Sequence, residues 1–196
     1  MLLHQSLVPS HVLVDILSTS DHLLTLAFNV AYQSLFGSLA SSELRRLVLF
    51  ENFNQQYPHS CVESDCDPIR IPAYAVSREV ANISLKLEHL PASFMVDASY
   101  FFHACEPSWR WHNLTSLTPT SRLLVPDDSP TEIDDMLKAA AAMAMKIPNL
   151  ETMKIWNGRK GMAMFFRYQS IKGEQDAVIT WRGTEEFTLQ PDVIQT

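Results

Sequence analysis

The sequence predicts an α/β fold in which short strand–helix units stack into an irregular solenoid that ends in an antiparallel hairpin cap. Apolar residues recur on the spacing LxxLxL, as at Leu44, Leu47 and Leu49. Stretches with helical periodicity separate several of these recurrences, and the last part of the chain is rich in β-forming residues. A unit of this kind cannot bury its own apolar face, whereas stacked neighbours can.

Each LxxLxL segment is predicted to be a short strand, because this spacing turns alternate apolar side chains toward one side. The predicted units begin at unequal intervals, which makes the solenoid irregular; their first residues are Leu23, Leu44, Leu87, Leu114 and Leu150. The alternative is ordinary βα alternation in an open sheet, which would show similar strands without a common spacing.

The clearest predicted helix covers residues 130–147. Pro130 suits its first turn, and the acidic residues Glu132, Asp134 and Asp135 lie near the positive end of its dipole. Shorter helices are expected within residues 28–40, 75–90, with Ser77 as a candidate N-cap, and 97–105. Residues 54–73, with three prolines, are predicted to be the longest loop.

The C-terminal part is predicted to form the cap. "GMAMFFRYQ" and "AVITWRG" have strand-like composition, and "KGEQD" between them suits a hairpin connection. The chain therefore divides into an N-terminal helical segment or remnant (1–20), a repeat-like strand–helix domain (21–158) and a β-rich cap (159–196).

Composition limits the possible partners. The chain has 196 residues, 46% of them hydrophobic, and a formal net charge of −7. This acidic balance argues against a nucleic-acid surface and against an anionic membrane. No apolar run is long enough for a transmembrane helix. Three cysteines at low density suggest a reducing compartment, so the cytoplasm or nucleus is expected.

The pattern LxxLxLxxN at residues 44–52 resembles a leucine-rich repeat. The segments "HACEPSWRWHNLTSLTPTSRLL", "LKAAAAMAMKIPNLETMKIWNGRKGMAMFFRYQ" and "ITWRGTEEF" resemble an uncharacterised family of filamentous-fungal proteins. Longer members of that family tend to begin with an F-box-like segment and to continue as irregular leucine-rich repeats. The resemblance covers most of residues 20–190 and implies substrate recognition in an F-box-type ubiquitin ligase.

The sequence departs from that family pattern at two places. No F-box-like segment is recognised before residue 20, which gives the chain the look of a shortened product. The repeat asparagine is present at Asn52, whereas Asn157 stands one place early, so no regular asparagine ladder is expected.

No catalytic residue and no cofactor are predicted, because GxSxG, HExxH, GxxxxGK[ST] and GxGxxG motifs do not occur. The glycines and cations of "NGRKG" (157–161) lack phosphate-loop spacing and are interpreted as a β-turn. The alternative function is a small α/β hydrolase or transferase, with His103 or His112 as the base. It would require one deep pocket with a perturbed histidine or cysteine.

A zinc site is considered and not favoured. Its ligands would come from thiol and imidazole side chains, but the spacings CxxxxC and HxC do not bring such groups together, the latter because residues two apart on a helix diverge. Separate buried or surface residues are the favoured interpretation for His59, Cys61, Cys66, His103 and Cys105.

Four tryptophans are candidates for a binding face. Trp109 and Trp111 flank Arg110 just before a predicted strand, where alternation would place both on one side. Either they fill the core or they form an exposed aromatic hot spot. Trp156 and Trp181 lie in predicted strands and are candidates for the same face.

Three arginines follow predicted strands at comparable places, namely Arg122, Arg159 and Arg182. If the strands stack in register, these arginines would line one rim and could bind an acidic partner or peptide. The expected function is therefore a non-enzymatic interaction domain that presents a strand-side surface to a protein partner, with no nucleic acid and no membrane involved.

Overall fold

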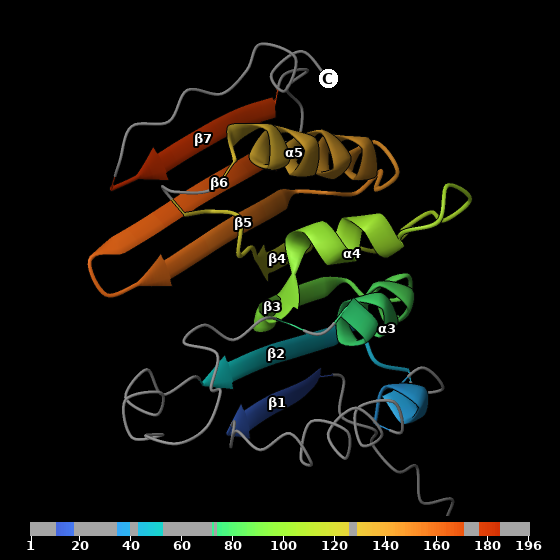
Figure 1. The fold of residues 1–196 in the computed structure, drawn as a ribbon. Coiled ribbons are helices and arrows are strands. Elements are labelled where there is room, and N and C mark those ends of the chain that lie inside the picture. Colours follow the sequence, from blue (N-terminus) through green and yellow to red (C-terminus); the bar gives the residue numbers. More distant parts are fainter. Residues whose placement is uncertain are drawn as a thin grey trace, which may run out of the picture.

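A seven-stranded mixed sheet follows the order of the chain, β1-β2-β3-β4-β5-β6-β7 (Figure 1). The structure is a computed structural model that describes residues 11–17, 35–39, 43–52, 72, 74–125, 129–170 and 177–184. Strands β1 to β5 run parallel to one another, whereas β6 and β7 are antiparallel to their neighbours. Strand bounds are His11–Leu17, Arg46–Asn52, His89–Asp97, Ser116–Thr120, Thr152–Arg159, Met162–Ser170 and Ala177–Gly183, for β1 to β7 in order.

Helices α3 (Tyr74–Ser84), α4 (Ala98–Ala104) and α5 (Pro130–Ala144) connect the parallel strands. Parallel crossovers are right-handed almost without exception, so crossovers that always step to the next strand in the same direction place their helices on one face. The three helices do lie side by side on the same face, α3 against α4 and α4 against α5. A short helical segment covers residues 35–39.

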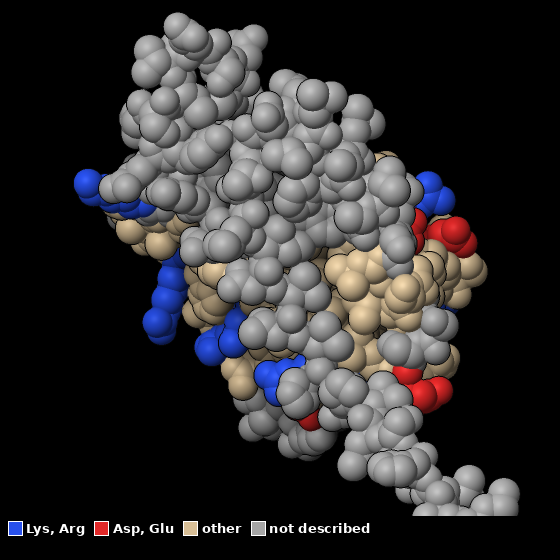
Figure 2. Space-filling model, turned by 90° about the horizontal axis from the view of Figure 1, so that it is seen from below, with Lys and Arg blue, Asp and Glu red and all other residues tan. Residues whose placement is uncertain are grey.

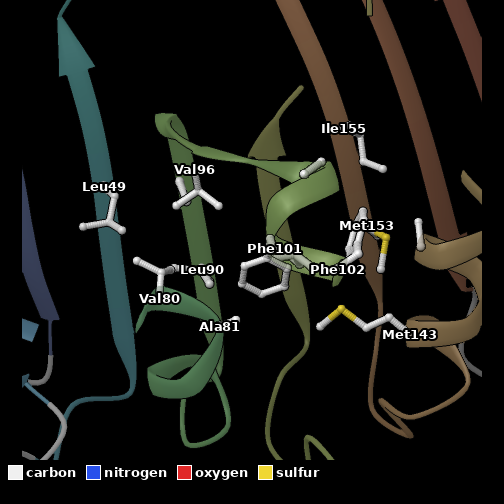
Figure 3. Close-up of a cluster of buried hydrophobic side chains, with 14 of the residues drawn as sticks. Leu49, Val80, Ala81, Leu90, Val96, Phe101, Phe102, Met143, Met153 and Ile155 are labelled. Carbon is white, nitrogen blue, oxygen red and sulfur yellow. The ribbon is translucent and has the colours of Figure 1, made fainter. Parts of the chain in front are cut away.

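The hydrophobic core lies between the helices and the sheet. Alternate residues of each strand point to the helices and are buried, as Leu47 and Leu49 on β2 illustrate. Figure 3 shows how side chains from the helices meet this layer; the labelled ones from the helices are Val80, Ala81, Phe101, Phe102 and Met143. Helix α5 contributes Ile133, Met136, Leu137, Ala140 and Met143 to the core.

Asp97 joins the end of β3 to two other elements. Its side chain is fully buried and caps α4, because Oδ1 accepts hydrogen bonds from the backbone N–H groups of Ser99 (2.9 Å) and Tyr100 (3.4 Å). Its other oxygen, Oδ2, accepts a hydrogen bond from the backbone N–H of Arg122 at 2.8 Å. The carboxylate therefore holds the start of α4 against the turn that follows β4.

Several predictions from the sequence are confirmed. The segments that begin at Leu44, Leu87, Leu114 and Leu150 contain the neighbouring parallel strands β2 to β5. Strands β6 and β7 form an antiparallel hairpin joined across residues 171–176. Helix α5 begins at Pro130, and "NGRKG" spans the turn between β5 and β6.

Two local expectations are wrong. Residues 11–17 form a strand that pairs with β2, not a helical segment, because the β-branched residues Val12, Val14 and Ile16 favour extended backbone. Ser77 does not cap a helix, since α3 already begins at Tyr74 and Ser77 is buried inside it. The unit expected at Leu23 and most of the loop expected at 54–73 lie outside the described residues.

The boundary expected at residues 158 and 159 falls inside β5, and β6 pairs with β5 along its whole length. The β-rich C-terminal strands thus continue the same sheet. Among the helices that the structure describes, none is both long enough and apolar enough to cross a membrane.

Replacing Asp97 with Ala should lower the free energy of unfolding by about 2–4 kcal/mol, because three backbone N–H groups lose a charged acceptor. Urea denaturation monitored by circular dichroism measures this change. Asp135→Ala is the matched control, since Asp135 is exposed on α5 and its loss should cost no more than about 0.5 kcal/mol. Equal losses for the two variants would contradict the role given to Asp97.

Candidate functional site

The sheet has a second face, which points away from α3, α4 and α5. We call it the outer face and define it by the positions of β2 to β7 that alternate with the buried ones. Most of its side chains are half-buried or exposed, and Phe50 and Val178 expose 39% and 44% of their surface. The outer face consists of Arg46, Val48, Phe50, His89, Pro91, Ser93, Phe94, Ser116, Thr118, Thr152, Lys154, Trp156, Phe165, Arg167, Gln169, Val178, Thr180 and Arg182.

Three aromatic rings from different strands meet on the outer face. The ring of Phe94 packs edge-on against Phe50, with centroids 6.2 Å apart, and against Trp156, with centroids 5.1 Å apart. Phe165 on β6 is the cross-strand partner of Trp156. We call these four residues the aromatic row. It crosses the sheet from β2 to β6, so it is a continuous apolar feature and not a set of scattered side chains.

Phe94 reaches this position through a distortion of β3. Its φ is 61°, in the left-handed region that bulky side chains rarely adopt. The register between β3 and β4 shifts between Ala92 and Asp97, which marks a bulge. Thr120 holds the bulge, because its Oγ1 accepts a hydrogen bond from Phe94 N–H (2.8 Å) and donates one to the Val96 carbonyl (3.3 Å). Such a conformation costs about 1–3 kcal/mol and is often found at functional sites.

The outer face is basic although the chain is acidic overall. Arg46, Lys154, Arg167 and Arg182 lie on it, and among the outer-face positions defined above none is Asp or Glu. Lys154 and Arg167 are direct cross-strand partners on β5 and β6. Charges are distributed unevenly over the molecule. Figure 2 views it from the β1 end, and in this view most Lys and Arg side chains lie to the left and most Asp and Glu to the right.

Arg167 is oriented by its other neighbour in the sheet. Its Nη2 donates a hydrogen bond to Oγ1 of Thr180 on β7 at 3.1 Å. Its Nε is buried and has no hydrogen-bond partner among the described residues. The guanidinium group is therefore held in place with one donor unsatisfied.

Only one of the four tryptophans expected at a binding face belongs to the outer face, and that one is Trp156. Trp111 is fully buried and donates a hydrogen bond from Nε1 to Ser84 Oγ at 2.7 Å, so it fills the core. Trp109 packs edge-on against Trp111, and Trp181 pairs with the buried Phe166 on the helix side of the sheet. Placing Trp111 on a binding face was wrong. Trp111 precedes β4, so the alternation of side chains along that strand does not apply to it.

The rim of three arginines stays a prediction, because the side chain of Arg159 lies outside the described part of the structure. Arg122 is exposed beyond β4, with its guanidinium 5.6 Å from the ring centroid of Tyr100 on α4. Arg182 lies within β7, where it pairs with Phe165 on the outer face. Arg159 is the last residue of β5, and its side chain is outside the described part of the structure. Strands β4, β5 and β7 run in the same direction, so all three residues lie near the same edge of the sheet.

Among the aromatic and basic residues of the outer face, sequence reasoning missed Arg46, Phe50, Phe94, Lys154, Phe165 and Arg167. Phe50, Lys154 and Arg167 could have been found, because each alternates with the apolar residues of its predicted strand. Phe94 could not have been found, because in a strand without a bulge its side chain would point to the other face of the sheet. The bulge depends on the contact with Thr120, which is distant in the sequence.

The described residues among those considered for catalysis or metal binding are not grouped into a site. His103 and His112 are exposed, on α4 and after it. Cys105 donates a hydrogen bond from Sγ to the Phe101 carbonyl at 3.1 Å, and burial raises the pKa of its thiol to about 12 despite the opposing charge of Lys146. In the described part of the chain, no three His, Cys, Asp or Glu side chains are grouped to hold a metal ion. His59, Cys61 and Cys66 lie outside it.

Together these features define a mixed α/β domain in which helices cover one face of the sheet and an aromatic, basic surface occupies the other. The chain belongs to a family of unknown function, DUF6546, whose model matches residues 38–196. This family match supports neither the F-box-like segment nor the leucine-rich repeats to which the sequence shows a resemblance. Comparison with curated proteins and with solved structures gave no match.

Replacing Phe94 with Gly should change the free energy of unfolding by less than about 1 kcal/mol. Relief of about 1–3 kcal/mol of backbone strain offsets the loss of two ring contacts and the entropy cost of glycine. Phe101→Ala is the comparison, because Phe101 is fully buried and its truncation should cost about 3–5 kcal/mol. If denaturant unfolding gives the two variants the same loss, Phe94 is a structural residue and not a strained surface residue.

The Cys105 thiol should make the protein less stable at high pH. Its folded pKa of about 12 lies above that of an unfolded thiol, so its stabilising contribution is complete below about pH 9 and is lost as the pH rises toward 12. Urea unfolding at pH 8 and at pH 10.5 measures the loss. Cys105→Ser serves as the reference, because other groups titrate identically in both proteins. A variant with the same decline as the wild type would rule out this contribution.

Proposed function

We propose that the chain is a non-enzymatic protein-interaction domain that presents the outer face to a protein partner. The observation that carries this proposal is the aromatic row, which places apolar rings from β2, β3, β5 and β6 on the face that the helices leave uncovered. Aromatic and arginine side chains are the residue types that contribute most to protein interfaces. The outer face contains both.

The architecture we propose is an irregular solenoid like that of leucine-rich repeats. Purely parallel sheets in ordinary α/β folds are covered on both faces, and their strands are apolar throughout. Here β2 to β5 are sequential and parallel, yet they alternate buried and partly exposed side chains, as in Leu47, Val48 and Leu49. Stacked repeats produce this combination and use the extended strand side for binding.

The strain at Phe94 supports a binding role for the same face. A left-handed phenylalanine persists only when its surroundings impose it, and here Thr120 supplies the hydrogen bonds that do so. The distortion contributes little to the core, because the Phe94 ring contacts Phe50 and Trp156 on the outer face. A bulge that redirects one side chain to a surface is a common device next to functional sites.

We extend the proposal to the context that the sequence resemblance implies. In the longer, fungal-type proteins, this domain would choose substrates for an F-box-type ubiquitin ligase in the cytoplasm or nucleus. The support is the likeness of residues 103–124, 137–169 and 179–187 to those proteins, together with the proposed solenoid architecture. A protein that binds the outer face would then be ubiquitylated in the native host.

Site-specific photo-crosslinking tests the interaction surface. The photoreactive residue p-benzoylphenylalanine replaces Phe50 on the outer face in one variant and Met145 after α5 in the other; Met145 is 68% exposed and serves as the matched control. After irradiation in lysate of the native host, the Phe50 variant should form a discrete protein adduct, identified by mass spectrometry, that the Met145 variant does not form. The same adducts from both positions, or none from Phe50, would refute the proposed surface.

A further inference from the structure

We infer that the partner segment bound by the outer face is extended and acidic, and that Lys154 and Arg167 hold one of its carboxylates. This inference rests on the proposed function and adds the chemistry of the partner. It is supported by the pairing of the two cations, the geometry of Arg167, and the position of the aromatic row beside them.

Folding stability does not explain the pairing of Lys154 with Arg167. The two residues are direct partners in the antiparallel pair of β5 and β6, where like charges repel and opposite charges attract. No acidic residue occupies the outer-face positions of β2 to β7 to neutralise them. The arrangement therefore lowers stability in the free protein, and an anion supplied from outside would relieve the repulsion.

Arg167 is prepared for such an anion. Its Nη2 is held by Thr180 Oγ1 at 3.1 Å, so the guanidinium loses little conformational freedom when a ligand arrives. Its Nε–H has no partner among the described residues but is shielded from solvent, so an incoming carboxylate would have to use the terminal Nη groups. Carboxylates match the planar donor array of arginine, and a carboxylate between Arg167 and Lys154 would be bound by both charges.

The aromatic row lies next to this cation pair at a spacing that suits an extended chain. Trp156 follows Lys154 by two residues on β5, and Phe165 precedes Arg167 by two residues on the antiparallel β6. Two residues of a strand span roughly 6.6 Å, which is also the repeat between side chains on one side of an extended peptide. The surface therefore fits an acidic residue and an apolar residue two positions apart.

Nucleic acid fits the surface less well than an acidic peptide. The chain carries a formal net charge of −7, and proteins that bind nucleic acid generally have basic surfaces of larger extent. Base stacking needs free ring faces, but the Phe94 ring stands at 76° to that of Phe50 and at 72° to that of Trp156, in edge contact with both. The aromatic row thus forms a packed apolar ridge.

Fluorescence anisotropy with defined probes tests the inference on the full chain. The probes are a labelled peptide of about twelve residues with Glu and Leu two positions apart, the same peptide with Gln for each Glu, and a single-stranded RNA of similar length. The charge-reversed variant is K154E/R167E. The matched control is R78E/K138E, which makes the same change in net charge at exposed positions of α3 and α5.

The wild type should bind the Glu peptide at least about tenfold more tightly than the Gln peptide, and K154E/R167E should lose about tenfold or more of that affinity. R78E/K138E should stay within about twofold of the wild type, and added salt should weaken binding. Circular dichroism confirms that each variant is folded.

A single substitution separates binding from folding. K154E replaces a like-charge pair with an opposite-charge pair across β5 and β6, so it should raise the midpoint of thermal unfolding by about 1–4 °C while it weakens binding of the Glu peptide. A residue needed only for structure would not show these opposite changes.

Three results would overturn the inference: equal affinity for the Glu and Gln peptides, equal loss in K154E/R167E and R78E/K138E, or tighter binding of the RNA than of the Glu peptide. Failure of the wild type to bind the Glu peptide would overturn it as well. Crosslinking through Phe50 is independent of these measurements. If it identifies a partner while the peptide test fails, the outer face remains the interaction surface and only its preference for an acidic segment is wrong.

Discussion

The handedness of the crossovers is the constraint on which the remaining structure depends. Strands β1 to β5 are parallel and sequential, and each described helix joins one strand to the next. Because such crossovers are right-handed, α3, α4 and α5 all lie on one face. One face of the sheet therefore becomes the core, and the helices leave the other uncovered. Because the helices cover only one face, side chains along β2 and β5 alternate between buried and partly exposed.

A single hydrogen-bonded junction links the core to the outer face. Asp97 ties the end of β3 to the start of α4 and to the turn after β4, while Thr120, its partner in the sheet, holds the bulge at Phe94. The Ser121 backbone N–H in turn donates to the Trp156 carbonyl at 3.0 Å, which connects this turn to β5. The groups that stabilise the helix layer thus also position Phe94 and Trp156 on the opposite side of the sheet.

The outer face combines features that stability alone does not favour. It has a strained aromatic residue at Phe94, an exposed aromatic ring at Phe50 and a like-charge pair at Lys154 and Arg167. Each could be removed by a conservative change without loss of core packing, since the buried residues of the same strands point the other way. These costs support the recognition role that we propose for the outer face.

The sequence by itself determined strands β2 to β5, the main helix and the C-terminal hairpin, because these depend on local periodicity. Apolar residues at Leu47 and Leu49 repeat with a period of two, and the acidic first turn after Pro130 marks the start of α5. It did not determine the outer face. Trp111 and Trp156 are both candidates for one face by sequence, yet Trp111 is buried against Ser84 and Trp156 lies on the outer face. Tertiary structure decided this difference, because Trp111 is held by Ser84, 27 residues earlier, and the Phe94 ring that meets Trp156 is positioned by Thr120, 26 residues later.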